Sequence, residues 1–398
     1  MRILIITDQF PFPPKNGVQL PIYHLIRILS KDYSIDLNLI VKDRFIDDEA
    51  FYENTKMKEY INEFRLIKAK KYSNIIKIIN EIFLLKPTFY YESVSKDETI
   101  KNKYDLIWCS PIGSVGIADE INMYKKSKIG IGLHESTVYS HLSSFNQIIN
   151  KTLRFRMEYL IKILRVPWIW YHEKKILNSV NIIQVQTPLE KKRISRLYGK
   201  IVSEKVVIAH NGRANINKKS ENYGKDNLVF FTHLSEYRKH EAEWFLKKVW
   251  PIIIDKAPNI TLSIVGTPPD KEHNIEIYKS NSVLIKGYVD DLNEVYSSAT
   301  VCVVPTQHNV GWVNRVADAL TFGVPIVACS GPLLTIPGLI IGKHALKGDS
   351  VIEFANNVIK LIDNEKFRQQ IVYNGKILSK SFNSWDDSIN HICSKIYN

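Results

Sequence analysis

A predicted helix in the C-terminal half of the chain carries side chains that suit an anionic ligand. Residues 311–328 read GWVNRVADALTFGVPIVA and follow the apolar run TVCVVP (300–305). Arg315 and Asp318 are three positions apart, so both side chains can lie on one side of a helix. The N–H groups and dipole of a helix N-terminus attract anions, and a guanidinium adds donors for phosphate oxygens. Asp318 would accept hydrogen bonds from ribose hydroxyls, and the alternative is a surface Arg–Asp pair.

Further candidate residues follow predicted strands in the N-terminal half. The loop PFPPKNG (11–17) contains Gly17, where a backbone without Cβ can approach a ligand closely. The alternative for this loop is a proline-rich turn. The segment LHEST (133–137) follows the strand pattern KIGIGL and places His134 and Glu135 just beyond a strand. A structural histidine is the alternative there.

Composition limits the class of protein. A chain of 398 residues exceeds one compact core, so two domains are expected. No apolar run approaches the roughly 20 residues that a membrane-spanning helix needs, and the start MRILIITDQF reads as a strand. The four cysteines have no metal-ligand spacing and no Asp-x-Asp motif occurs, so we expect no metal and a reduced, cytoplasmic compartment.

Positive charge is concentrated in the first half of the chain. The first 211 residues carry +11 of the total net charge of +13, which indicates an anionic partner. Residues 68–86 and 151–176 combine basic side chains with apolar residues at helical spacing, which is typical of a membrane-surface helix. Ordinary surface helices are the alternative. No nucleic-acid motif accompanies the charge, so nucleic acid is not expected.

Two series of alternating strands and helices indicate two Rossmann-like, doubly wound α/β domains. We predict strands at 2–7, 35–41, 104–109, 128–133, 181–186 and 205–209, and then at 227–232, 260–266, 283–287, 300–305 and 325–330. The predicted domains are 1–211, which would hold the acceptor, and 212–380, which would hold the donor. Residues 381–398 would form a helix that packs back on the first domain. Ligands bind at the carboxyl ends of such strands, so a site in a cleft between facing domains is expected.

The stretch at 311–328 resembles the donor-site signature of GT-B glycosyltransferases, especially the retaining, nucleotide-sugar-dependent family 4 group. That resemblance implies that Arg315 binds the diphosphate and that Asp318 binds the ribose. Gly311 and Asn314 belong to the same signature and are assigned to donor binding. Many members carry a second Glu eight positions before the acid, and here that position is Val310. The usual contact to the donor sugar is therefore in doubt.

The resemblance also covers the first domain. PFPPKNG is similar to the family's first loop, which implies that Asn16 and Gly17 lie against the donor diphosphate. The family often has a His or Asp beside the reaction centre, in the position of LHEST. This implies catalytic roles for His134 and Glu135. The segment IAHNG (208–212) resembles the family's hinge, where a simple turn is the alternative.

Two further donor-domain segments are family-like. FFTHLSEYRKHEAEW resembles the family's first strand, loop and helix, which implies that Arg238 or Lys239 faces the diphosphate. IKGYVDDLNEVY is similar to the segment at which the nucleotide base binds. The resemblance implies that the backbone of Gly287, Tyr288 and Val289 contacts the base.

The expected function is transfer of a sugar from a nucleoside diphosphate sugar to a hydroxyl acceptor, namely a saccharide or a lipid-linked saccharide. The resemblance implies retention of anomeric configuration and needs no cofactor beyond the donor substrate. Peripheral binding to the inner face of the membrane is expected. Two alternatives remain: a nucleotide-sugar epimerase of the same architecture, and a non-enzymatic or degenerate protein that only binds the donor.

Overall fold

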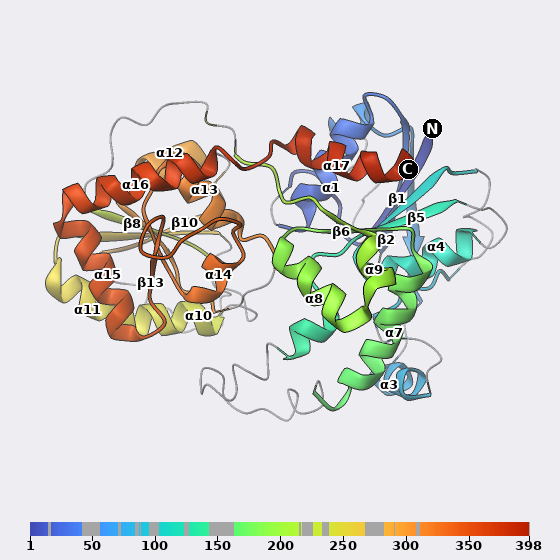
Figure 1. The fold of residues 1–398 in the computed structure, drawn as a ribbon, viewed down its shortest axis with the longest axis horizontal. Coiled ribbons are helices and arrows are strands. Elements are labelled where there is room, and N and C mark those ends of the chain that lie inside the picture. Colours follow the sequence, from blue (N-terminus) through green and yellow to red (C-terminus); the bar gives the residue numbers. More distant parts are fainter. Residues whose placement is uncertain are drawn as a thin grey trace. The chain divides into compact units, whose positions relative to one another are not determined.

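The computed structural model divides the chain into two compact units (Figure 1). Unit 1 comprises Met1–Asn211 and Trp385–Asn398, and unit 2 comprises Gly212–Ser384. The structure describes residues 1–14, 17–41, 56–70, 73–83, 87, 89–94, 103–122, 127–142, 163–214, 216, 226–232, 239–266, 282–289, 291–307 and 311–397. Each unit is considered by itself below.

Unit 1 contains a seven-stranded sheet in the order β3-β2-β1-β4-β5-β6-β7, with every pair parallel. The strands are β1 (Arg2–Thr7), β2 (Ser34–Val41), β3 (Glu63–Lys68), β4 (Leu106–Ser110), β5 (Lys128–Gly132), β6 (Ile182–Val185) and β7 (Val206–Ile208). The helices are α1 (Gln19–Leu29), α3 (Asn74–Ile82), α4 (Val115–Asn122), α7 (Val166–Ser179), α8 (Pro188–Tyr198), α9 (Lys200–Glu204) and α17 (Trp385–Tyr397). Short 3-10 turns lie at η1 (Lys56–Glu59) and η3 (Ile112–Ser114).

The predicted amphipathic stretch at 68–86 was wrong at its start, because Lys68 ends β3. Helix α3 covers Asn74–Ile82, and residues 84–86 of the stretch lie outside the described residues. The pattern EFRLIK (63–68) is short and half polar, so it did not stand out as a strand. It pairs at the edge beside β2, where one side of the strand has no neighbour in the described sheet.

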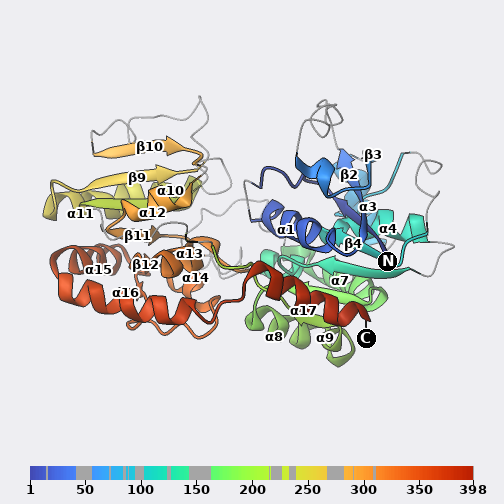
Figure 2. The same cartoon turned by 90° about the horizontal axis from the view of Figure 1, so that it is seen from above.

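Unit 2 contains a six-stranded parallel sheet in the order β10-β9-β8-β11-β12-β13 (Figure 2). The strands are β8 (Asn227–Phe231), β9 (Thr261–Val265), β10 (Val283–Gly287), β11 (Val301–Val304), β12 (Ile326–Ala328) and β13 (Leu346–Lys347). The helical elements are α10 (Lys239–Trp244), the π-helical turn η4 (Phe245–Val249), α11 (Trp250–Lys256), α12 (Leu292–Ser297), α13 (Asn314–Phe322), α14 (Ser330–Leu334), α15 (Val351–Asp363) and α16 (Glu365–Ser379). The two-residue strand β13 was not predicted, because two residues show no periodicity.

The strands are buried runs because helices cover both faces of each sheet. In unit 1 the last helix, α17, completes one of these layers. Ile389, Ile392 and Ile396 of α17 belong to the core cluster that also contains Ile22 and Leu25 of α1. The two helices lie side by side in both views (Figures 1 and 2). Residues from opposite ends of the chain therefore build one core.

Aromatic stacking and charge fix the register of α17 on α1. The imidazole of His24 stacks on Trp385, with ring centroids 4.0 Å apart and planes 10° apart. Lys31 donates a hydrogen bond to Asp386 at 3.1 Å. Among the described residues, no helix is long and apolar enough to cross a bilayer.

Candidate active site

The charged helix α13 starts at the carboxyl edge of the unit 2 sheet. Its loop leaves β11, turns at Gly311 with φ of 66°, and reaches the buried Trp312, whose ring packs edge-to-face on Phe382. Val316 and Leu320 then face the core. Gly323 ends the helix in the left-handed conformation, with φ of 75°. The predicted helix from Asn314 to Phe322 is thus confirmed.

Arg315 is held by the end of the neighbouring strand β8. Its Nη1 donates a hydrogen bond to the carbonyl oxygen of Phe231, the last residue of β8, at 2.6 Å. The Tyr296 hydroxyl donates to the Arg315 carbonyl at 3.3 Å. The Tyr296 ring stacks on Phe322, with centroids 4.8 Å apart. These contacts hold the guanidinium where strand β8 ends and α13 begins.

Asp318 does not pair with Arg315. Among the described residues, its half-buried carboxylate has no hydrogen-bond or ion-pair partner. Desolvation by the surrounding protein raises the pKa of Asp318 to about 7. The interpretation of these residues as a surface Arg–Asp pair is therefore wrong, and the carboxylate is available as an acceptor.

The carboxyl ends of β9 and β10 approach each other closely. The Gly266 N–H donates to the Gly287 carbonyl at 2.8 Å, and a Cβ on Gly266 would lie 2.1 Å from the carbonyl oxygen of Thr232. Gly287 has φ of 69°, and a Cβ there would meet no atom of the described residues within 4 Å. Tyr288 is 50% exposed just beyond it, while Val289 packs on the core. The exposed ring of Tyr288 thus follows a glycine, Gly287, that has unfilled space beside its Cα among the described residues.

In unit 1, His134 lies two residues beyond β5. Its Nε2 is 3.1 Å from the Oγ of Ser110, the last residue of β4. Burial lowers the pKa of His134 to about 4, and the Asp8 charge opposes this shift. The imidazole is therefore neutral at pH 7, so it has one donor and one acceptor nitrogen.

Asp8 and Ser110 bring three strand ends together around this histidine. Asp8 directly follows β1, and the last residue of β1, Thr7, is in register with Ser110. The Tyr91 hydroxyl donates to Asp8 Oδ2 at 2.8 Å. Asp8 and Ser110 were not predicted as site residues, although their position at the ends of buried strands could have marked them.

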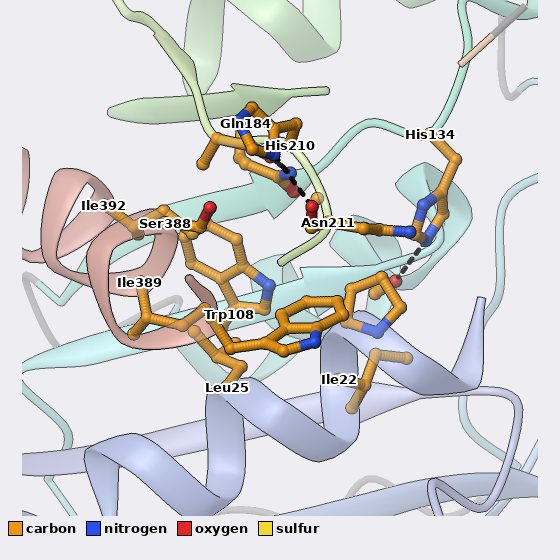
Figure 3. A pocket seen from close by; sticks show the side chains of 15 residues that line it. Ile22, Leu25, Trp108, His134, Gln184, His210, Asn211, Ser388, Ile389 and Ile392 are labelled. Atoms are coloured by element: carbon orange, nitrogen blue, oxygen red, sulfur yellow. Dashed lines mark hydrogen bonds between the residues drawn. The ribbon is translucent and has the colours of Figure 1, made fainter. Parts of the chain in front are cut away.

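A pocket lies beside His134 within unit 1 (Figure 3). Its apolar wall comes from α1 and α17, and its polar groups come from the ends of β4, β5, β6 and β7. The lining residues are Pro21, Ile22, Leu25, Trp108, Ser110, Gly132, His134, Gln184, Ala209, His210, Asn211, Trp385, Ser388, Ile389 and Ile392. The Asn211-Gly212 turn predicted as a hinge thus contributes Asn211 to a pocket wall, buried and hydrogen-bonded to Gln186.

Several predicted residues fall outside the described part of the chain. Asn16, Arg238 and Val310 lie there, as do residues 151–162 of the basic stretch. Lys239 begins α10, but its side chain is not described. Gly17 is exposed one residue before the cap of α1, and Glu135 is half-buried beside His134. No group of three or more metal-ligating side chains occurs among the described residues.

Comparison with known proteins agrees with this architecture. Residues 225–364 match the family model described as Glycosyl transferases group 1. A Klebsiella pneumoniae "uncharacterized 44.6 kDa protein in cps region" is 22% identical over 386 residues, covering 94% of each chain. An uncharacterized glycosyltransferase of Haemophilus influenzae is 22% identical over 220 residues, covering 54% of each. The structure of Anabaena Alr3699/HepE in complex with UDP and glucose superposes with a TM-score of 0.65 at 12% identity, covering 99% of each chain.

Two parallel, doubly wound units of this kind define the GT-B class of fold, as the sequence predicted. Within unit 2, residues 225–364 match the glycosyl transferases group 1 family, and the whole chain shares the fold of solved GT-B glycosyltransferases. Helix α13, with Arg315 and Asp318, lies inside the matched residues.

Proposed function

We propose that this protein transfers a glycosyl group from a nucleoside diphosphate sugar to a hydroxyl of a saccharide or lipid-linked saccharide, with retention and without a metal ion. The observation that carries the proposal is the α13 arrangement. Arg315 is anchored at the end of β8, and three residues later Asp318 presents an unpaired carboxylate. A cation beside a helix N-terminus suits a diphosphate, and a nearby carboxylate suits a ribose diol.

The diphosphate is the leaving group of this reaction, and negative charge grows on it as the bond to the sugar breaks. Preorganised positive charge stabilises that transition state, and such electrostatic stabilisation is usually a large part of catalysis. Arg315 is preorganised because the Phe231 carbonyl and the α13 backbone fix it. The undescribed Arg238 and the first residue of α10, Lys239, are proposed as further cations. Fixed cations remove the need for a metal ion.

The nucleoside would lie along the carboxyl ends of β9, β10 and β11. Asp318 would accept hydrogen bonds from the ribose hydroxyls, and Gly287 and Tyr288 would contact the base. The open space at Gly287 and the exposed ring of Tyr288 favour this placement. The Anabaena structure is a complex with UDP and glucose. That likeness supports a nucleotide-sugar donor, with UDP as the first nucleotide to try.

His134 and Glu135 are proposed as the catalytic residues contributed by unit 1. A neutral imidazole can donate to or accept from a sugar hydroxyl without adding charge near the scissile bond. Ser110 holds one ring nitrogen of His134, so the other nitrogen keeps a defined role. The first loop, with Asn16 and Gly17, is proposed to lie against the diphosphate.

The acceptor is proposed to be a surface-polysaccharide intermediate, because the Klebsiella relative is described as a protein of the cps region. If such an acceptor is lipid-linked, the enzyme must reach a membrane surface. Helix α3 offers an apolar stripe for this contact. Ile76, Ile79, Ile82 and Phe83 are exposed at three- and four-residue spacing, and Phe83 is 71% exposed.

Charge and orientation favour an anionic lipid surface as the partner of this stripe. The opposite side of α3 is fixed, because the buried Glu81 accepts from Arg165 Nε at 2.7 Å and from its Nη2 at 2.9 Å. The apolar stripe therefore points away from α7. The net charge of +11 over residues 1–211 would attract anionic headgroups.

A panel of UDP-, GDP-, ADP- and dTDP-sugars tests the proposal. Free nucleotide is measured with and without saccharide acceptors. Release that depends on the acceptor supports transfer. Conversion of the donor to its epimer without acceptor would indicate an epimerase, and binding without turnover would indicate a protein that only binds the donor.

A further inference from the structure

The loop that carries His134 and Glu135 is hydrogen-bonded at its C-terminal end to a buried glutamate of a helix that is distant in sequence. The carboxylate of Glu173, on α7, is fully buried. Its Oε2 accepts a hydrogen bond from the backbone N–H of Val138 at 3.2 Å. This amide lies four positions after His134 in the sequence. Glu173 therefore holds the backbone close to the proposed catalytic residues.

Two further side chains, Ser136 and Tyr198, support the same backbone segment. Ser136 Oγ accepts from the N–H of Tyr139 at 3.4 Å and lies 3.5 Å from the hydroxyl of Tyr198 at the end of α8. Helical structure begins at Thr137, directly after Ser136. The first amides of a helix have no partners within the helix, so Ser136 and Glu173 each satisfy one of them.

The other end of the loop is held from two neighbouring strands. The Leu133 N–H donates to the Gln184 carbonyl of β6 at 2.9 Å. His134 Nε2 contacts Ser110 Oγ of β4 at 3.1 Å. The run 133–138 is thus fixed from β4, β6 and α7, and Glu173 is its only charged anchor among the contacts described here.

An ionised carboxylate at the buried position of Glu173 lowers the stability of the fold. Burial raises the pKa of Glu173 to about 7, and the hydrogen bond from Val138 opposes that rise. Glu173 Oε1 has no hydrogen-bond partner among the described residues. A neutral side chain of the same shape would avoid most of this desolvation cost. A carboxylate that costs stability suggests a function that needs its charge.

We propose that Glu173 is a positioning residue for sugar transfer: its carboxylate fixes the Val138 amide and thereby the orientation of His134 and Glu135. The inference rests on the roles proposed above for those two residues. The ionised carboxylate accepts more strongly than a protonated acid or an amide, because the hydrogen bond is then charge-assisted. The titratable group that faces Glu173 from another element is Tyr198. Burial, and then the Glu173 charge, raise its pKa far above neutrality, so it stays protonated.

The Glu173→Gln variant tests the proposal, because it keeps shape and removes charge. With UDP-glucose, or the panel donor that gives turnover, we expect kcat at pH 8.5 to fall about 10-fold, with KM for the donor unchanged. The wild-type kcat should decline as the pH falls through about 7. The kcat of the variant should not show this decline. Because the raised pKa costs the wild type stability above pH 7, Tm of the variant at pH 8.5 should be equal or higher.

A matched control is Glu190→Gln. Glu190 is also buried and also accepts a backbone N–H at a helix start, from Gln186 at 3.2 Å. We expect kcat of this control within about 2-fold of the wild type, because the hydrogen bonds described for Glu190 join it to Gln186 and Thr187 at the start of its own helix, α8. If Glu173→Gln keeps kcat and the pH limb, or loses Tm and activity together, the positioning role is overturned.

Amide hydrogen exchange separates this inference from the proposed function, since it needs no substrate. The Val138 amide should exchange at least 10-fold faster in Glu173→Gln than in the wild type at pH 8.5, while the amides of α7 should exchange at the wild-type rate. Equal exchange of Val138 in the two proteins overturns the positioning role. His134→Ala is measured in parallel. Full turnover in His134→Ala would refute the role of His134, while the exchange result would still decide whether Glu173 fixes the loop.

Discussion

The two candidate sites are built in opposite ways. In unit 2, Arg315 and Asp318 lie on one helix, three residues apart, and the carboxylate is open to a ligand. In unit 1, His134 is made neutral by burial and is held by side chains that are 24 or more residues away in sequence, such as Ser110. The first arrangement supplies fixed charge for a charged ligand. The second supplies a neutral, oriented hydrogen-bonding group.

This difference predicts where charge matters. Removal of a charge in unit 2 should weaken binding of the donor and stabilisation of its leaving group. Changes at His134 in unit 1 should alter turnover and leave nucleotide binding intact. The following predictions test that separation.

The largest expected effect is that of Arg315→Ala. Loss of one preorganised donor to a developing charge typically lowers kcat about 10²–10³-fold, and we expect a fall of that size in kcat/KM. Steady-state nucleotide release measures it. Arg368→Ala is a matched control, because Arg368 also donates to backbone carbonyls of unit 2, those of Leu361 and Ile362. Near-normal turnover in Arg315→Ala would remove the assignment of the diphosphate site.

His134→Ala should lower kcat about 100-fold, in line with the loss of a positioned general acid–base or hydrogen-bonding group. Its dissociation constant for the nucleotide should stay within about 2-fold of the wild type, since His134 is not among the residues proposed to bind the nucleotide. Calorimetric titration with UDP measures the second quantity. Because the pKa of His134 is about 4, no limb of the pH–rate profile near 6.5 should be lost in this variant. A weaker UDP affinity would contradict the separation between the two units.

The two sites also differ in how far the sequence reveals them. Helix α13 could be predicted because its start, its apolar spacing and its Gly323 stop are contiguous in the sequence. The strands of both sheets other than β3 and β13 were found for the same reason, since buried parallel strands read as apolar runs. Local patterns therefore predicted most of the fold and helix α13, whereas the ligand roles of Arg315 and Asp318 came from the family resemblance and are proposals.

The surroundings of His134 could not be predicted from spacing. Ser110, Asp8 and Glu173 come from three different elements, and only the sheet order β1-β4-β5 and the packing of α7 bring them near the loop. A glutamate in the pattern YHEKKIL also reads as a solvent-exposed position, whereas Glu173 is fully buried. Tertiary packing, which has no local signature, decides these contacts.

Asp318→Asn should produce a smaller effect that depends on pH. The carboxylate accepts ribose hydroxyls best when ionised, so the wild-type affinity for UDP should increase as the pH rises through about 7. The variant should bind about 10-fold more weakly at pH 8.5, with little pH dependence, since a hydrogen bond to a charged group contributes about 1.5–3 kcal/mol. Calorimetric titration at pH 6 and pH 8.5 measures this. An unchanged pH dependence in the variant would show that another group titrates.

Asp318→Asn should weaken UDP binding at high pH, but it should not lower the stability of the fold. Because the pKa of Asp318 is raised in the folded protein, the unfolded chain loses its proton first, and stability falls as the pH rises from about 4 to 7. Asp318→Asn should therefore have an equal or higher Tm at pH 8.5. Asp363→Asn, at the exposed end of α15, should change neither Tm nor UDP affinity. A lower Tm in Asp318→Asn would mean that the carboxylate is held by partners that stabilise the fold.

The smallest effect on chemistry is expected at α3, far in sequence from both sites. Replacement of Ile79 and Phe83 by Ser should weaken sedimentation with vesicles containing anionic phospholipid several-fold, because apolar burial and charge attraction add in interfacial binding. Turnover with a soluble acceptor should stay unchanged. Added salt should weaken the wild type further, since screening acts on the charge term. Binding that is insensitive to both the substitutions and salt would place any membrane contact elsewhere on unit 1, and the apolar stripe of α3 would then need another partner.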